Sequence, residues 1–110
     1  MRVLLFASLA VIASTSAPAD PAKPLFTYQD YPAEAVRNNW QGDVTVNLTI
    51  GTTGRATDCR IIKSSGYKIL DDATCKIFVE RAKFLPKIGP NGTPVEFHWT
   101  PAPIGWHLYP

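Results

Sequence analysis

The fold is decided by residues 59–86, which read CRIIKSSGYKILDDATCKIFVERAKFLP. Cys59 and Ile61 alternate with polar or outward-facing positions, as they would in a half-buried strand. The small polar residues and the glycine at 64–66 favour turn geometry, so they are predicted to end this strand. A helix is predicted to follow and to stop at Pro86. The strand and the helix each carry a cysteine on the apolar face, so we expect them to pack as one unit.

The helix in this stretch is predicted to begin at Asp71, whose carboxylate would accept the free N–H groups of the first turn. Leu70 and Cys75 would form the hydrophobic staple across that cap. Apolar residues then recur at helical spacing and define the face expected to be buried: Cys75, Phe78, Val79 and Ala82.

Residues 1–19 of the 110 are predicted to be a cleaved signal peptide. Arg2 supplies the positive charge, residues 3–13 the apolar core, and Ala17-Pro18-Ala19 the small-residue cleavage site. The apolar run is about half of the roughly 20 residues that span a bilayer. Residues 20–27 are then expected to be a Pro-rich tether, and residues 28–110 a single domain. The formal charge of +2 is too balanced to indicate a nucleic-acid partner or an anionic membrane surface.

The chain has two cysteines, Cys59 and Cys75, an even number in a chain predicted to be exported. Closing the loop between them would contribute about 3 kcal/mol in the chain-entropy model. A redox-active pair would instead be expected as Cys-x-x-Cys at a helix N-terminus, where a thiolate is stabilised. The spacing therefore favours a structural disulfide.

The remaining elements follow from periodicity and turn residues. A short helix is predicted after Tyr31-Pro32, with Ala33, Val36 and Trp40 on one face, ending at Gly42. Residues 43–50 alternate strictly and are the clearest strand, which is followed by a hairpin turn at 51–54. A second turn is expected at 89–92.

The last predicted strand runs from Pro94 to Thr100, with Val95, Phe97 and Trp99 inward and Glu96, His98 and Thr100 outward. The tail at 101–110 is expected to be an extended segment folded back over the domain. The order α-β-β-α-β predicts an α+β fold, a three-stranded antiparallel sheet with two helices packed on one face.

No pattern indicates catalysis or a cofactor. His98 and His107 fit no zinc-ligand spacing with the cysteines, and Ser64-Ser65 has no neighbouring histidine or acid in an obvious relay. Asp71 and Asp72 point about 100° apart on a helix, so they do not form an acid–base pair. We therefore predict a protein that is not an enzyme and that has no metal site and no cofactor. The open edge of the last strand is left as the candidate binding surface, although its bracketing prolines also serve to prevent aggregation.

Between Tyr28 and Thr100, a set of residues resembles the C-terminal domain of the TonB energy-transducer family in its order and spacing. The set is Tyr31-Pro32, Gly42-Asp43-Val44-Thr45-Val46, Gly54, Ser64-Ser65-Gly66, Leu70-Asp71, Ala73, Arg81, Phe84-x-Pro86 and Gly92-x-Pro94-Val95. The resemblance implies a periplasmic domain that captures the TonB-box strand of an outer-membrane transporter by adding it to the last strand. Carried over by position, the partner-binding strand is Pro94, Val95, Glu96, Phe97, His98, Trp99 and Thr100, with Tyr31 and Pro32 of the family's Tyr-Pro motif beside it.

Full transducers of this family carry a membrane anchor and a long Pro-rich spacer, whereas this chain is predicted to have a signal peptide and a short tether. Such a module could bind a partner without being able to transmit force. We expect a transporter or another envelope protein as partner, and neither a nucleic acid nor a small-molecule substrate. Membrane contact is expected only through the partner, and a homodimer is left open. The alternative is a scaffolding envelope protein that has the fold but no transport role.

Overall fold

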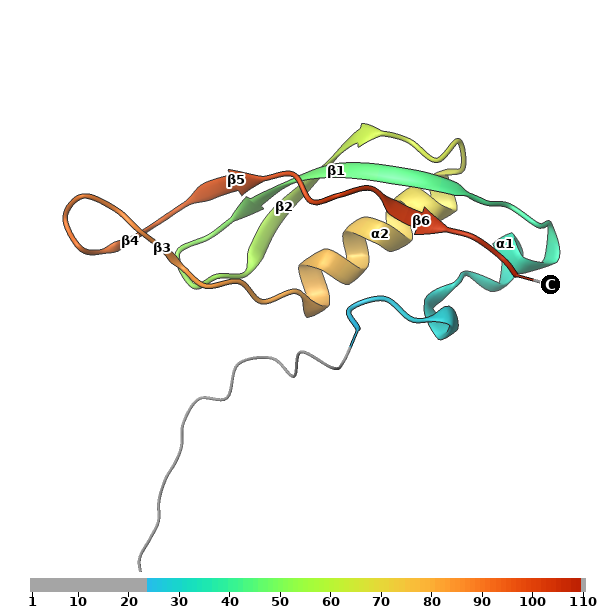
Figure 1. The fold of residues 1–110 in the computed structure, drawn as a ribbon, viewed down its shortest axis with the longest axis horizontal. Coiled ribbons are helices and arrows are strands. Elements are labelled where there is room, and N and C mark those ends of the chain that lie inside the picture. Colours follow the sequence, from blue (N-terminus) through green and yellow to red (C-terminus); the bar gives the residue numbers. More distant parts are fainter. Residues whose placement is uncertain (1–23, 110) are drawn as a thin grey trace, which may run out of the picture.

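The structure is a computed structural model that describes residues 24–109 (Figure 1). The predicted signal peptide and residues 20–23 of the predicted tether lie outside the described residues. The elements follow the order η1 (Tyr28–Asp30, a 3-10 helix), α1 (Ala33–Arg37), β1 (Gly42–Ile50), β2 (Ala56–Lys63), α2 (Lys68–Arg81), β3 (Lys87–Ile88), β4 (Pro94–Val95), β5 (Phe97–Trp99) and β6 (Ile104–Trp106). None of the helices between residues 24 and 109 is long and apolar enough to cross a membrane.

Strand β1 is the centre of an antiparallel sheet. Its side chains alternate as predicted, and the inward set is fully buried: Val44, Val46, Leu48 and Ile50. Strand β2 pairs with one side of β1, whereas β5 and β6 share the other side. The β1–β2 hairpin also agrees with the prediction. Gly54 has a φ of +86°, and a Cβ there would lie 2.0 Å from the carbonyl oxygen of Phe84, so only glycine fits this turn.

Helix α2 lies across one face of the sheet, and it begins at Lys68 (Figure 1). The predicted N-cap role of Asp71 is therefore wrong, because this residue lies inside the helix. Its carboxylate instead accepts hydrogen bonds from the preceding loop, at 2.9 Å from the N–H of Ser65, at 2.8 Å from Ser65 Oγ, and from Ser64 Oγ. Burial acts to raise the pKa of Asp71, but these hydrogen bonds outweigh it and hold the pKa below its ordinary value.

The buried face of α2 agrees with the predicted one at Phe78 and, at the C-cap, Ala82, but not at Val79. It consists of Leu70, Asp71, Thr74, Ile77 and Phe78. Leu70 is a core residue within the helix, so the staple with Cys75 is also wrong. Val79 is exposed, because it lies with Cys75 toward the β2 side of the helix rather than over β1.

Helix α1 is shorter than predicted and buries a different residue. It ends at Arg37, and Asn39 adopts a φ of +56°, a conformation in which asparagine commonly ends helices. Ala35 is fully buried whereas Val36 is exposed, so the predicted face of Ala33, Val36 and Trp40 is wrong. The helix packs through Ala35, its third residue, and Tyr31 just before it also lies in the core.

A disulfide joins Cys59 of β2 to Cys75 of α2, as the sequence predicted. Cys59 lies opposite Leu48, so the bridge ties the helix to β2 on the face of the sheet that α2 covers.

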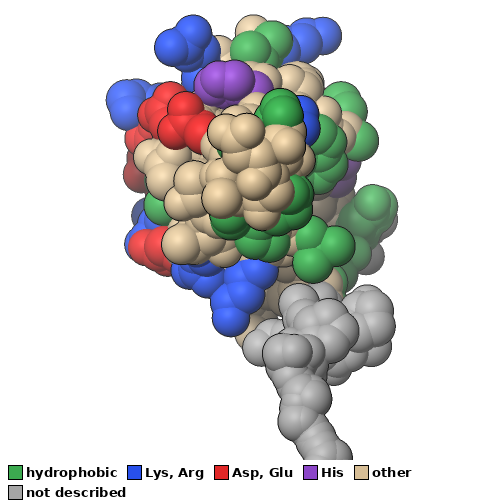
Figure 2. Space-filling model, turned by 90° about the vertical axis from the view of Figure 1, so that its left-hand side faces the viewer, with side chains coloured by type: hydrophobic (Ala, Val, Ile, Leu, Met, Phe, Trp, Pro, Cys, Tyr) green, Lys and Arg blue, Asp and Glu red, His purple; other side chains and the backbone are tan. Residues whose placement is uncertain are grey.

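The turn predicted at 89–92 is present, with Gly92 at a φ of +78° and the Gly89 N–H donating to the Thr93 carbonyl at 2.8 Å. It closes a two-stranded hairpin, β3–β4, which projects from the body of the domain (Figure 1). Leu85 and Ile88 are exposed there. Viewed from this end, hydrophobic side chains reach the surface between groups of basic and acidic ones (Figure 2).

The tail folds back on the domain, and part of it forms a strand, β6, that the sequence did not predict. Gly42, Asp43 and Val44 of β1 pair with Trp106, Gly105 and Ile104 respectively. The α+β class with two helices and an antiparallel sheet is confirmed, and β6 extends the sheet to four strands.

Candidate partner-binding edge

The strand predicted at 94–100 is divided in two. Pro94 and Val95 form β4 and pair with β3, whereas Phe97–Trp99 form β5 and pair with β1. The prediction of one continuous strand is therefore wrong. The alternation of inward and outward residues continues through Glu96 from β4 into β5. It therefore did not show that the two halves pair with different strands, β3 and β1.

The direction of the backbone groups along β1 follows from its hairpin with β2. Gly51 donates its N–H to the carbonyl of Arg55 at 2.8 Å, so the backbone groups of Gly51 face the β2 side. Backbone groups alternate in direction along an antiparallel strand. Those of Thr49 and Asp43 therefore also face the β2 side, and those of the intervening even-numbered residues face β5 and β6.

This alternation identifies the backbone groups that remain open at the edge. His98 opposes Thr49, and Gly105 opposes Asp43. Because the groups of Thr49 and Asp43 point away from β5 and β6, these are non-hydrogen-bonded pairs. The N–H and C=O of His98 and of Gly105 consequently point outward, away from the sheet, where an added strand would lie.

The side chains of β5 separate by face. His98 Nδ1 is hydrogen-bonded to Thr49 Oγ1 at 3.1 Å, and Thr100 Oγ1 accepts from the Asn47 side-chain amide at 2.9 Å, on the face away from α2. Trp99 lies on the other face, where its ring meets that of Phe84 edge to face at 5.1 Å, and 43% of its side-chain surface is exposed. The outward assignments of His98 and Thr100 therefore agree with the sequence, and Trp99 covers the edge of the core.

Tyr31 of the Tyr-Pro motif lies beside β6 rather than β5. Tyr31 is buried, its hydroxyl donates to the carbonyl of Trp40, and its ring meets Trp106 edge to face at 5.3 Å. Burial raises the pKa of the Tyr31 hydroxyl. Pro32 is half-buried at the N-cap of α1. The structure thus brings Tyr31 to β6, which follows β5 along the same side of β1, and not to the predicted binding strand.

A groove of about 400 Å³ runs between the N-terminal segment and β6. Its walls are mainly apolar and aromatic, and they include Phe26, Tyr28, Tyr31, Ile104, Gly105 and Trp106. Tyr28 and Tyr109 form its rim, with ring centroids 6.2 Å apart and exposures of 74% and 71%. The open backbone groups of Gly105 therefore lie in a hollow lined by rings.

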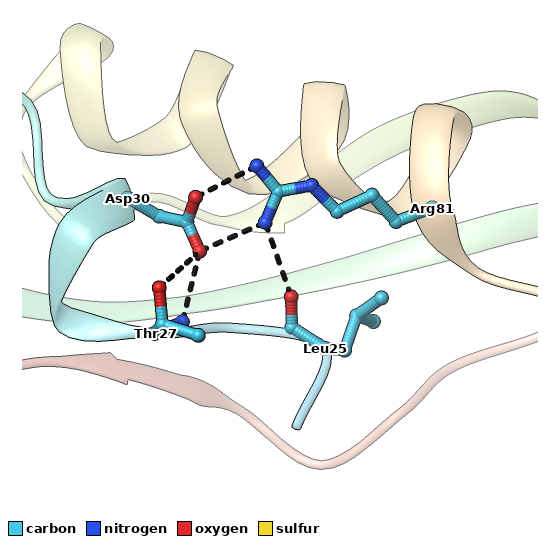
Figure 3. Close-up of polar contacts among 4 residues, drawn as sticks. All are labelled: Leu25, Thr27, Asp30 and Arg81. Atoms are coloured by element: carbon cyan, nitrogen blue, oxygen red, sulfur yellow. Dashed lines mark hydrogen bonds and ion pairs between the residues drawn. The ribbon is translucent and has the colours of Figure 1, made fainter. Parts of the chain in front are cut away.

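An ion pair holds the N-terminal segment in place (Figure 3). Arg81, at the end of α2, binds both carboxylate oxygens of Asp30, at 2.7 and 2.8 Å, and donates to the Leu25 carbonyl at 3.4 Å. Thr27 donates its N–H and its hydroxyl to the same carboxylate. The hydrogen bonds from Arg81 lower the pKa of Asp30 to about 2. This cluster, the Asp30–Arg81 clamp, fixes the wall of the groove against the helix.

The opposite edge of the sheet, β2, is less suited to strand addition. Its pairing with β1 contains two register shifts, and its exposed residues include Asp58, Arg60 and Lys63. Bulges and charges are common means of protecting an edge from further pairing. The disulfide adds a covalent link to α2 on that side.

Two parts of this site had no recognisable signal in the sequence. Strand β6 has three residues, too few for a periodicity to be recognised. Asp30 and Arg81 lie 51 positions apart, and nothing local links them. Among residues 24–109 there is no group of three or more His, Cys, Asp or Glu side chains arranged to hold a metal ion.

Comparison with known proteins gives two matches. The family model described as Gram-negative bacterial TonB protein C-terminal matches residues 27–108. Protein tonB2 of Pseudomonas aeruginosa is 34% identical over 79 residues, which make up 72% of this chain and 28% of that relative. The chain therefore covers less than a third of that relative's length. No solved structure matches the chain.

Proposed function

Because the chain belongs to the family of Gram-negative bacterial TonB protein C-terminal domains, we propose that it is a periplasmic protein-binding module that serves TonB-dependent transport. Its partner is an extended segment of the TonB-box type in an outer-membrane transporter. That segment binds by adding a strand to β5. No cofactor and no small-molecule substrate takes part.

The observation that carries this proposal is the outward-facing backbone of His98 on β5, whose pairing with β1 contains no register shift, unlike that of β2. An added strand would satisfy these groups, which water otherwise solvates. Of the residues between 94 and 100, those of β5 offer this edge, since Pro94 and Val95 already pair with β3. Pairing through the backbone gives little side-chain selectivity, so we expect a micromolar dissociation constant, about −8 kcal/mol.

The test is an NMR titration of the ¹⁵N-labelled chain with a TonB-box peptide. We expect shifts at residues 97–99 and slowed amide exchange at His98. Two variants of one residue form a matched pair, because His98→Ala keeps the outward N–H and His98→Pro removes it. The alanine variant should bind within about threefold of the parent, and the proline variant should lose binding while keeping the fold.

Peptides methylated on the backbone nitrogen provide the complementary control. N-methylation at every second position, in the phase that faces β5, should abolish binding, whereas the opposite phase should leave it intact. An unperturbed β5 at millimolar peptide, or shifts confined to β2, would contradict the proposal and leave the scaffolding alternative.

A further inference from the structure

We propose that the groove beside β6 is a side-chain pocket for the same extended partner segment, and that it takes one aromatic or large aliphatic side chain. This inference rests on the proposed function, since it extends strand addition from β5 to β6, the next strand along the same side of β1. Backbone pairing alone distinguishes poorly between peptide sequences, so the groove would supply the selectivity for the sequence of the partner.

The lining of the groove defines the chemistry of its occupant. Phe26 and Tyr31 both meet Trp106 edge to face, with ring centroids 5.9 and 5.3 Å apart, and these three rings form the floor. The exposed rings of Tyr28 and Tyr109 stand at the rim. A wall of aromatic faces and edges favours another ring or a branched aliphatic group. A volume of about 400 Å³ is near the lower end for a ligand pocket, so it suits a side chain better than a helix.

The backbone at the groove indicates that the occupant is an extended peptide. Gly105 lines the groove, and its N–H and C=O point outward because it opposes Asp43 in a non-hydrogen-bonded pair. A strand that exchanged two hydrogen bonds with Gly105 would run along the groove and place a neighbouring side chain in it.

The register fixes the length of such a partner. His98 opposes Thr49, and Gly105 opposes Asp43, six positions earlier on β1. At about 3.4 Å per residue the two open backbone positions are roughly 20 Å apart, so one extended segment of about seven residues reaches both. Between them lie Pro101 and Pro103, which have no N–H to offer an added strand. We therefore expect the partner segment to pair with His98 and with Gly105, and to make no backbone hydrogen bonds to the prolines between them.

The groove is preformed on its N-terminal side. The Asp30–Arg81 clamp and the Phe26–Phe78 ring contact, at 5.3 Å, hold the N-terminal segment on α2. Walls that are ordered before binding reduce the entropy lost on association, which raises affinity without any new contact.

The test uses two nine-residue peptides of alternating Thr and Val. When residue 1 pairs with His98, residue 7 pairs with Gly105. Residue 8, the neighbour of that residue, is Phe in one peptide and Ala in the other. We expect both to shift the amide of His98, but only the Phe peptide to shift that of Gly105. Burying the ring should make the Phe peptide bind about tenfold more tightly.

Rim variants separate the groove from the rest of the edge. Tyr28→Ala and Tyr109→Ala change exposed side chains, so the fold should persist. Each should reduce the preference for the Phe peptide severalfold and leave the affinity of the Ala peptide unchanged. Leu85→Ala, at a side chain 90% exposed near the β3–β4 hairpin, is the matched control and should leave both affinities unchanged.

The outcomes distinguish this inference from the function on which it rests. Shifts at His98 with equal affinities and no shift at Gly105 would overturn the groove proposal and leave strand addition at β5 intact. No shift at His98 with either peptide would instead contradict the proposed function. Shifts at Gly105 that grow with protein concentration in the absence of peptide would make a second copy of the chain the occupant, and would also overturn the groove proposal.

Discussion

Replacing Trp106 by alanine tests whether β6 belongs to the folded core. The side chain is 4% exposed, and its Nε1–H donates to Thr74 Oγ1 at 2.8 Å. Thr74 in turn donates to the carbonyl of Leu70 at 2.8 Å, so the hydroxyl bridges the ring and the helix backbone. The ring also contacts Phe26 and Tyr31 edge to face. One residue therefore joins β6, α2 and the N-terminal segment.

The expected cost follows from these contacts. Truncating a buried Trp to alanine typically costs 3–5 kcal/mol, so we expect Trp106→Ala to lower the free energy of unfolding by about 4 kcal/mol. Trp106→Phe keeps most of the ring but loses the hydrogen bond to Thr74, which amounts to about 1 kcal/mol, and some packed volume, so we expect about 2 kcal/mol in total. Trp99→Ala is the control, because that ring is 43% exposed and has one edge-to-face partner, and it should cost about 1 kcal/mol.

The assay is urea unfolding followed by circular dichroism, combined with native-state hydrogen exchange. The Phe variant keeps the experiment informative if the Ala variant does not fold. In Trp106→Phe the amides of β6 should exchange faster than those of β2. A cost for Trp106→Ala no greater than that for Trp99→Ala would refute the reasoning, since β6 would then be a loosely attached tail and the groove would lose its floor.

Three further perturbations test the rest of the fold. Reducing the disulfide, or replacing Cys59 and Cys75 by serine, should lower the free energy of unfolding by about 3 kcal/mol in denaturant melts, and reductant should then have no effect on the double serine variant. The pKa of Asp30 is lowered from 3.8 to about 2, so the stability that its ion pair contributes is present above about pH 4 and is lost as the pH falls to 2. Arg81→Gln should therefore flatten the acid dependence of the melting temperature. An unchanged pH profile in this variant would contradict the Asp30–Arg81 clamp. The pKa of Asp71 is also lowered, so its charge stabilises the fold above the ordinary pKa of aspartate, and this contribution is lost as the pH falls through the lowered pKa. Asp71→Asn should therefore cost most at pH 7 and progressively less as the pH falls below 3.8, and an equal cost across this range would show that the charge is not stabilising.

The sequence was sufficient where one period extended over many residues. Strand β1 alternates over nine residues, and both its burial and its hairpin agreed with the prediction. Helix α2 was recognised, but its first turn, from Lys68, was missed because Tyr67 offers no side-chain cap. Its start is set by contacts with other elements, since Leu70 packs in the core and Asp71 binds the loop before it. Local propensity does not report such contacts.

The candidate site was predictable only in part. Proline positions and alternation indicated an edge between Pro94 and Thr100, and the outward residues His98 and Thr100 were assigned correctly. The division at Glu96 depends on which partner each half meets, and a sequence pattern does not encode partners. The same holds for the clamp, whose two charges become neighbours only after the N-terminal segment has folded onto α2.

The arrangement of β5 and β6 explains how an edge stays open without being a hazard. A long, flat and unpaired edge strand templates aggregation, and proteins usually shorten or interrupt such edges. Here two strands of three residues share one side of β1, and the prolines at 101 and 103 interrupt the ladder between them. If the proposed mode of binding holds, a random strand would gain one short pairing. A segment of about seven residues with a large apolar side chain at one end would gain two pairings and fill the groove. The interruption between β5 and β6 would then itself make binding selective for the length of the segment and for that side chain.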